Sequence, residues 1–336
     1  MKCPNCSTKQ KYKDGLTCQK CGYRNALNPK EPPNITDYFL KSIVTKISRD
    51  GKMYYTYEQL LIQFIKGYGK KFINGWIVFY IVSFVILLAV FINYFFWMLA
   101  IIFSLGVMIG FYFLFSFRKT KNYDYSLLNK TLKTYLNNYP DKNLADGNAF
   151  SNNIQKIEEE LSNYAPESVL IVDKNDYTDM LLLNRYHIEN KVLVLSKYQY
   201  PKYIFEYFQK LIQKHPSIPI KILHEASEDG DKMKENLLAD TFWNLKDKEI
   251  HDLGLFWKDT KRLKRSFSLP KKTIGNITVG KNIPYQKDTR IPLGMIPPIV
   301  MGSVLIGTIS SGEAMTLADS LEEHQKNSFS GSADFG

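Results

Sequence analysis

Four cysteines, the only ones in the chain, all lie within the first 21 residues. They form two Cys-x-x-Cys pairs, Cys3 with Cys6 and Cys18 with Cys21, and eleven residues separate the pairs. Two such pairs supply four thiolates to one tetrahedral ion, which leaves no open coordination position for catalysis. The spacing therefore predicts a closed structural Zn²⁺ site, and a pair of disulfides is the alternative.

Residues 1 to about 25 resemble the zinc-ribbon family, in which Gly22 would provide the tight turn that follows the second cysteine pair. Members of this family bind nucleic acid, bind proteins or cap a chain end, so the resemblance implies a metal-organised module without one fixed function. The lysines of this stretch are either phosphate contacts or a solvated basic face. They are Lys9, Lys11, Lys13 and Lys20.

A second set of candidate residues is acidic. Asp173 comes directly after an apolar run of strand length, and His224, Glu225 and Asp229 follow another such run. Carboxylates gathered at one sheet edge can hold Mg²⁺, which prefers hard oxygen ligands. Asp173, Glu225 and Asp229 are therefore candidate magnesium and catalytic residues, and His224 is a candidate proton carrier. The alternative is an acidic surface turn whose carboxylates cap the next helix.

The elements that must position these residues alternate between strands and helices. Apolar runs of strand length occupy residues 168–172, 191–195 and 218–223, and helical spacing occupies 177–185 and 201–214. Such alternation predicts an α/β fold with a mainly parallel sheet and right-handed crossovers. In these sheets ligands bind outside the carboxyl ends of the strands, where the acidic residues are expected.

The same stretch resembles the Toprim domain, in particular that of the DNA-cleaving subunit of type VI topoisomerase. A strand ends at Asp173, a second leads to a turn and helix at Pro201, and a third is followed by Glu225, Ser227 and Gly230. The resemblance implies that Asp173 takes the place of the first acidic residue of the family. It likewise implies that Glu225 and Ser227 replace the paired aspartates, and that Gly230 is the closing glycine.

The match covers about residues 166–258 and departs from the family pattern at one of its metal ligands. Ser227 is a neutral hydroxyl where a carboxylate is expected, which weakens the implied Mg²⁺ site, and Asp229 is the nearest replacement. The winged-helix domain that carries the nucleophilic tyrosine has no room before the first strand. Strand passage is therefore not expected, and a nuclease-like site or a module that binds without cutting remains.

Residues 72–117 contain no charged side chain. About 20 apolar residues cross a bilayer as one helix, so the run predicts a two-helix transmembrane hairpin at 76–95 and 97–117. Basic residues flank both ends, and the positive-inside rule then places both soluble parts in the cytoplasm. The sequence thus predicts a multi-pass cell-membrane protein with membrane lipids among its partners.

The remaining segments are divided by their composition. Apolar spacing predicts a helix at residues 37–47, and two polar helices are expected at 126–135 and 152–164. Thr56 and Gln59 match a capping box and predict a helix from Tyr57 to about Lys66. The expected divisions are a zinc ribbon (1–28), a helical neck (29–70), a helical connector (122–164), a Toprim-like domain (166–290), an apolar docking segment or helix (291–325) and a disordered tail (326–336).

The formal net charge of +11 favours anionic partners. A basic run at 259–272 would be an anion-binding segment or a solvated helix face. The chain lacks a Walker lysine loop and a serine or cysteine nucleophile constellation. We therefore expect a membrane-anchored binding or sensing protein that recognises nucleic acid or a protein partner, with a Mg²⁺-dependent nuclease or phosphodiesterase as the alternative.

Overall fold

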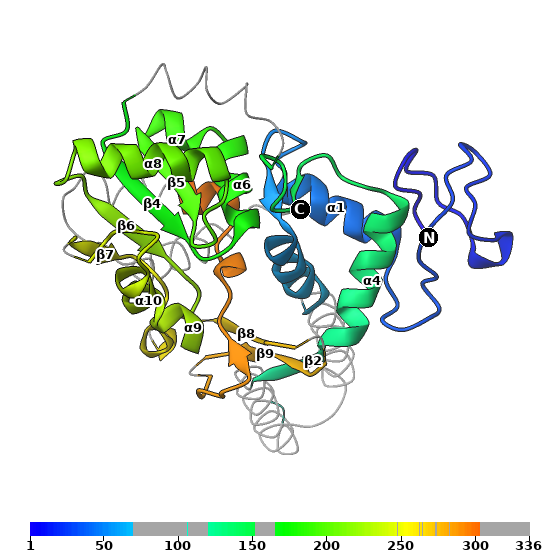
Figure 1. Ribbon diagram of the computed structural model, residues 1–336. Coiled ribbons are helices and arrows are strands. Elements are labelled where there is room, and N and C mark those ends of the chain that lie inside the picture. Colours follow the sequence, from blue (N-terminus) through cyan, green and yellow to red (C-terminus); the bar gives the residue numbers. More distant parts are fainter. Residues whose placement is uncertain are drawn as a thin grey trace.

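The computed structural model describes residues 1–69, 106, 120–151 and 165–302, apart from residues 247, 262, 264, 273 and 282. A parallel sheet of four strands, in the order β5-β4-β6-β7, occupies one end of the molecule (Figure 1). Every side chain of β4 and β5 is buried, as expected for a sheet covered on both faces. The α/β fold with a parallel sheet is therefore confirmed. The strands are β4 (Ser168–Val172), β5 (Val192–Ser196), β6 (Ile220–Leu223) and β7 (Ile250–Asp252).

Helices connect these strands and cover the sheet. In the longest of them, α8 (Lys202–Lys214), Phe205 and Phe208 recur on one face and pack against Trp243, at ring-centroid distances of 5.0 and 5.5 Å. Burial of such apolar stripes supplies most of the stability of a helix in a folded protein. The other helices of this part are α6 (Asn175–Leu183), α7 (Tyr186–Glu189), α9 (Glu228–Asp231) and α10 (Met233–Ala239).

A second sheet, which the sequence did not predict, is antiparallel with the order β10-β8-β9-β2. Its strand β8 lies within the basic run at 259–272, where all five of its side chains are buried. The solvated helix face considered for this run is therefore wrong for the strand. The members are β2 (Lys121–Asp124), β8 (Ser266–Pro270), β9 (Asn276–Gly280) and β10 (Thr289–Arg290), with the short helices η2 (Trp257–Lys261) and η3 (Leu293–Met295) beside them.

A helix at residues 57–69 lies between the two sheets and the N-terminal part of the chain. It begins as predicted, because the backbone N–H of Thr56 donates to Gln59 Oε1 at 2.9 Å and the N–H of Gln59 donates to Thr56 Oγ1 at 3.2 Å. Around it pack α1 (Asp37–Ile47), α4 (Tyr125–Asn138) and the parallel pair of β1 (Tyr55–Thr56) with β3 (Leu144–Ala145).

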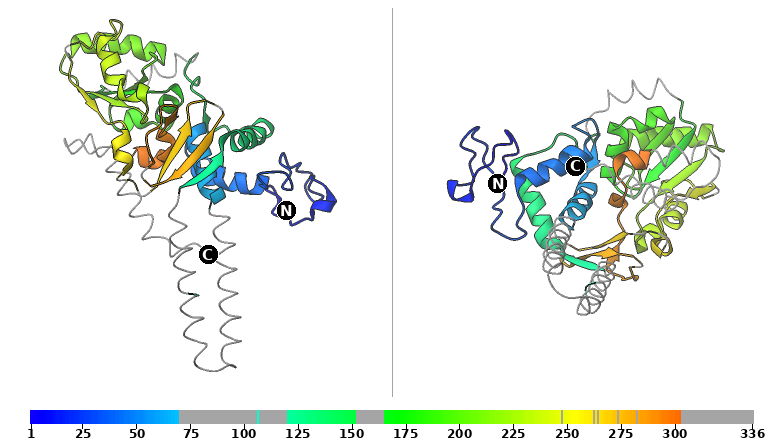
Figure 2. Two further views of the ribbon diagram at one scale, coloured as in Figure 1. Left: turned by 90° about the horizontal axis from the view of Figure 1, so that it is seen from below. Right: turned by 180° about the vertical axis from the view of Figure 1, so that it is seen from behind.

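The first 27 residues, here called the N-terminal module, lie at the opposite end of the molecule from the parallel sheet (Figure 2). The module contains the short helix η1 (Tyr12–Asp14) and is fixed to α1 through the buried carboxylate of Asp37. This carboxylate accepts hydrogen bonds from the N–H groups of Ala26 and Leu27, at 2.8 and 3.0 Å, and from the hydroxyl of Tyr23 at 3.0 Å. The module is therefore attached through buried, directional contacts.

The predicted location in the cell membrane needs correction. A crossing requires about 20 apolar residues in one helix, and no helix within the described ranges combines that length with that apolar character. The longest helices with both ends described, α4 with 14 residues and α8 with 13, bury one face only. Apart from residue 106, the predicted spans at 76–95 and 97–117 lie outside the described residues, as does the predicted helix at 152–164. The multi-pass location with cytoplasmic soluble parts therefore does not stand.

Candidate functional site

The four cysteines converge as their spacing predicts. Their Sγ atoms all lie within 4.8 Å of one another, with 3.6 Å between Cys3 and Cys21 and 3.6 Å between Cys6 and Cys18. All four are free thiols, so the disulfide alternative is not adopted. Four sulfur ligands around one point suit a tetrahedral ion, and the cluster can hold a metal such as zinc.

Local hydrogen bonds shape the backbone around the cysteine cluster and change the pKa of its thiols. Gly22 has a φ of 71°, and its N–H donates to the carbonyl of Cys18, which closes the turn after the second pair. Hydrogen bonds with Thr8 lower the pKa of Cys6 to about 6, whereas burial raises the pKa of Cys3 to about 11. A divalent ion would favour the thiolate form of both residues, because metal ligands must be deprotonated.

At the carboxyl ends of the parallel strands, Asp173 and Glu225 are neighbours. Asp173 is 3% exposed, and its Oδ2 accepts a hydrogen bond from the N–H of Glu225 at 3.1 Å. Its Oδ1 is buried without a hydrogen-bond partner in the part of the chain that the structure describes. Burial raises the pKa of Asp173 to about 6 and that of nearby Asp176 to about 7. The sheet edge thus holds carboxyl groups that keep a proton more readily than usual.

The carboxylate of Glu225 is paired with cations. Lys174 Nζ lies 2.6 Å from Glu225 Oε2 and 3.3 Å from Glu58 Oε1, and Arg290 Nη1 donates to both carboxylates. The hydroxyl of Tyr177 donates a further hydrogen bond to Glu58 at 2.7 Å. We call Glu58, Lys174, Glu225 and Arg290 the strand-end ion cluster. The two negative and two positive charges of this cluster give it a formal net charge of zero.

The electrostatics of the strand-end ion cluster favour the charged forms. Burial alone would raise the pKa of Glu58, but the charges of Arg290 and Lys174 outweigh it and hold that pKa well below its usual range. Burial would likewise lower the pKa of Lys174, and the charges of Glu58 and Glu225 raise it instead. Such a network is stable only while every charge keeps its partner.

Three members of the cluster, Glu58, Lys174 and Arg290, were not predicted as site residues. Glu58 comes from the first turn of helix 57–69 and is separated from Lys174 by 116 positions. Arg290 ends β10, which covers the sheet edge because the following residue, Ile291, forms an antiparallel bridge with Ala226. No local pattern links these residues, although Glu58 and Arg290 are each a lone charge beside apolar positions that the fold buries.

Asp229 does not share this environment, since it is exposed in the first turn of α9. Ser227 caps the same helix, and its Oγ accepts a hydrogen bond from the N–H of Gly230 at 3.1 Å. Asp229 thus lies in an acidic first helical turn, as in the alternative, but the helix is capped by the hydroxyl of Ser227 and not by a carboxylate. Within the described ranges, the cysteine quartet is the one group of His, Cys, Asp or Glu placed to share an ion. The magnesium prediction for Asp173, Glu225 and Asp229 therefore gains no support.

His224 has no exposed surface and uses both ring nitrogens. Nδ1 lies 2.9 Å from the carbonyl oxygen of Glu225, and Nε2 lies 3.0 Å from Asp252 Oδ1. Burial lowers the pKa of His224. The hydrogen bond with Asp252 and the charge of that residue raise it by a larger amount, so the pKa lies above its usual value. These contacts fix the backbone at Glu225. The role of His224 as a proton carrier stays a prediction.

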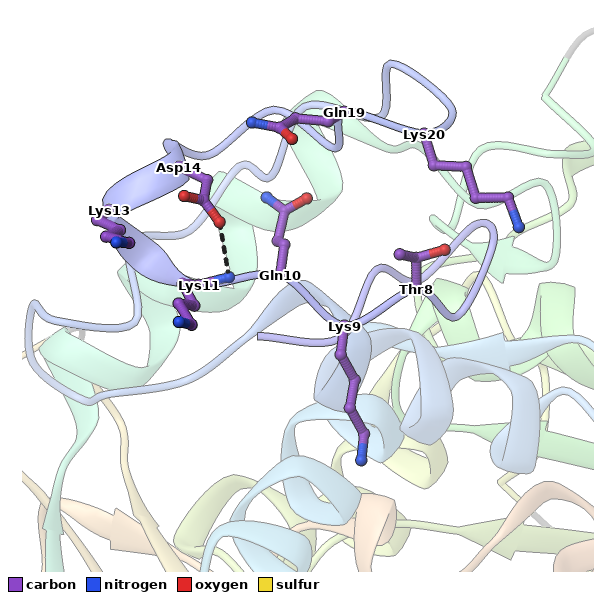
Figure 3. A pocket seen from close by; sticks show the side chains of 8 residues that line it. All are labelled: Thr8, Lys9, Gln10, Lys11, Lys13, Asp14, Gln19 and Lys20. Atoms are coloured by element: carbon purple, nitrogen blue, oxygen red, sulfur yellow. Dashed lines mark hydrogen bonds between the residues drawn. The ribbon is translucent and has the colours of Figure 1, made fainter.

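A basic concavity of about 770 Å³ lies on the N-terminal module (Figure 3). Its cations are all exposed, and within the described structure none of them forms an ion pair. The single carboxylate of its lining, Asp14, accepts a hydrogen bond from the backbone N–H of Lys11 at 3.1 Å. The lining of the concavity thus carries four lysine charges, those of Lys9, Lys11, Lys13 and Lys20, against the single carboxylate of Asp14.

Comparison with known proteins adds no relative: no protein family, curated protein or solved structure matches this chain.

Proposed function

We propose that this protein binds a nucleic acid or a protein partner through a zinc-ribbon module, and that its Toprim-like α/β domain serves as a non-catalytic scaffold. The pairing of Glu225 with Lys174 and Arg290 carries this proposal. The resemblance to zinc ribbons and to the Toprim domain supplies the two family assignments, and the cysteine quartet and the parallel sheet are compatible with them.

The pairing argues against Mg²⁺ chemistry at this edge of the sheet. A Mg²⁺ ion needs oxygen ligands in near-octahedral geometry and is bound through carboxylates that are open to it. Here the carboxylate of Glu225 already has two cationic partners, which would repel a divalent ion. Releasing the carboxylate would leave the partly buried cations of Lys174 and Arg290 with reduced compensation, which is costly.

One observation favours the phosphodiesterase alternative. The buried Oδ1 of Asp173 has no hydrogen-bond partner among the described residues, and its carboxyl pKa is raised to about 6. Raised carboxyl pKa values occur at catalytic sites as well as in structural networks. The test must therefore separate a buried structural carboxyl from a catalytic one.

The deciding experiment measures cleavage and ion binding in the same preparation. Labelled DNA and RNA are incubated with the full chain and millimolar Mg²⁺, and thermal unfolding is recorded with and without the ion. We expect intact substrates and an unchanged melting temperature, because an ion that binds only the folded state would raise it.

The informative variant is Glu225→Gln, and its matched control is Glu228→Gln. The side chain of Glu228 is 40% exposed and forms a surface ion pair with Lys232. If Mg²⁺-dependent cleavage is found, and Glu225→Gln abolishes it while Glu228→Gln does not, the protein is a nuclease and the binding proposal fails.

A further inference from the structure

We infer that the partner is a nucleic acid and that the concavity of the N-terminal module binds its phosphate backbone through Lys9, Lys11, Lys13 and Lys20. This inference rests on the proposed binding function and names both the surface and the partner.

The charge distribution of the module is the first argument. The first 24 residues carry five lysines and one arginine against one carboxylate, Asp14. Four thiolates around a divalent ion contribute a formal charge of about −2, so the module keeps a positive balance when metal is bound. One further lysine, Lys2, is engaged, since its Nζ donates to the hydroxyl of Tyr38 at 2.8 Å. The four lysines of the concavity have no such partner in the described structure.

The way the fold places the four lysines is the second argument. Lys9 forms an antiparallel bridge with Lys2. Lys11 precedes η1 and Lys13 belongs to it, and Lys20 lies between Cys18 and Cys21. The three segments meet around one hollow (Figure 3). Because the cysteine cluster ties the first and second pairs together, a bound metal would fix the spacing of these charges. A fixed group of cations can contact several phosphates of a nucleic-acid backbone.

The side chains between the lysines distinguish a nucleic acid from an acidic polypeptide. Tyr12 lies between Lys11 and Lys13 in the sequence, outside the lining of the concavity, and at 41% exposure it can stack on an unpaired base. Gln19 lines the concavity and carries an amide group suited to base edges or sugar hydroxyls, whereas Gln10 Nε2 donates to the carbonyl oxygens of Gly15 and Thr17 at 3.2 Å. The module lies away from the parallel sheet (Figure 2), and the four lysines of the concavity are exposed.

The test compares two variants of the full chain with equal net charge. In one, Lys9, Lys11, Lys13 and Lys20 are changed to Gln; in the control, four exposed lysines on α4, α8 and a distant loop are changed to Gln. The control positions are Lys130, Lys133, Lys202 and Lys246. Binding of a fluorescent single-stranded oligonucleotide is measured over a range of salt concentrations in buffer without Mg²⁺. Metal content and circular dichroism confirm that each variant is folded.

We expect the concavity variant to lose at least about tenfold in affinity, and the slope of log K against log salt to fall by about 3, near 0.7 for each lost phosphate contact. The control should bind like the parent chain. Equal losses in both variants would overturn the inference, because binding would then follow net charge alone. Competition by polyglutamate as strong as that by the oligonucleotide would overturn it as well, since the partner would then be an acidic polypeptide.

Failure of this inference can be distinguished from failure of the proposed function. Cleavage of the oligonucleotide on addition of Mg²⁺ would refute the non-catalytic role of the α/β domain, whereas loss of binding in the concavity variant concerns the module alone.

Discussion

Lys174 Nζ lies 2.6 Å from Glu225 Oε2, so the residue that follows Asp173 after β4 neutralises the carboxylate that follows β6. The same pair contacts Glu58 and Arg290, which come from a helix and a strand outside the parallel sheet. The sheet edge that could hold a ligand in an α/β protein is therefore occupied by the protein's own charges.

Removing one cation from the strand-end ion cluster should cost far more than removing an exposed one. Lys174→Met leaves Glu225 and Glu58, whose side chains are 9% exposed, with Arg290 alone. We expect the free energy of unfolding to fall by about 3 to 5 kcal/mol. Urea unfolding followed by circular dichroism measures it.

The chain offers a matched control for this substitution. Lys191 and Glu167 form a pair at the same distance of 2.6 Å, but their side chains are 59% and 68% exposed. Lys191→Met should change the free energy of unfolding by less than about 1 kcal/mol. Similar effects for the two variants would mean that burial does not decide the strength of the Lys174 pair.

The raised pKa of Asp173, about 6, should make stability depend on pH. Between the ordinary aspartate pKa of about 4 and pH 6, the folded protein binds more protons than the unfolded chain. The contribution of Asp173 to stability therefore rises as the pH falls, by about 1 kcal/mol between about pH 7.5 and pH 5. Asp173→Asn keeps an acceptor for the N–H of Glu225 and should remove this dependence.

Parallel measurements on the parent chain and on Asp173→Asn isolate this contribution, because acid effects on the metal cluster are common to both. Glu58 acts in the opposite direction, but only below about pH 4.5, since its pKa is lowered. A stability difference between the two proteins that stays constant from pH 7.5 to 5 would contradict the assignment.

Gly254 should tolerate no side chain. A Cβ at this position would lie 2.3 Å from the ring of His224, which is itself fixed by Asp252 and the Glu225 carbonyl. Gly254→Ala is expected to lower the free energy of unfolding by about 3 kcal/mol. Gly302→Ala, where no atom of the described residues lies within 4 Å of the new Cβ, should change it by less than about 1 kcal/mol. Denaturant titration compares the stabilities of the two variants. Equal losses of stability would show that His224 can move to make room for a side chain at residue 254.

Asp37→Ala should release the N-terminal module without changing the capacity of its cysteine cluster to hold a metal ion. The substitution leaves two backbone N–H groups and the Tyr23 hydroxyl without their buried acceptor, which costs about 3 kcal/mol in total. Protease cleavage between the module and α1 should become about a hundredfold faster, because its rate is proportional to the fraction of molecules in which the module is detached. The metal content should stay at one ion per chain. Asp14→Ala, at an exposed carboxylate, is the control, and loss of metal from Asp37→Ala would contradict the prediction.

Local patterns predicted the elements that depend on local interactions. The helix with the bounds Asp37–Ile47 was expected at the same residues, because its apolar spacing and its ends lie in one short stretch. The capping box of Thr56 and Gln59 closes within four residues, and the cysteine pairs lie close together in sequence. Continuous apolar runs predicted β4 and β5 to within about one residue, since buried parallel strands leave that pattern.

Contacts between distant segments left no such pattern. The antiparallel sheet pairs β2 with β9, and Thr278 donates to Asn122 across 156 positions. Two-residue strands such as β10 are too short to show an alternation. The acidic residues after β6 suggested a metal site, but their counter-ions come from Lys174 and Arg290, which a sequence pattern could not place beside them.

The pairing of β2 with β9 also limits how this protein can be divided for study. A fragment that starts at residue 166 would keep the whole parallel sheet but lose β2, which would leave β9 as an open edge that can recruit a strand from another chain. The same fragment would lose Glu58, so Lys174 and Arg290 would share one buried carboxylate. An expression fragment of the α/β part therefore needs residues 55–69 and 120–145 supplied with it, either in one polypeptide or as a co-expressed second piece.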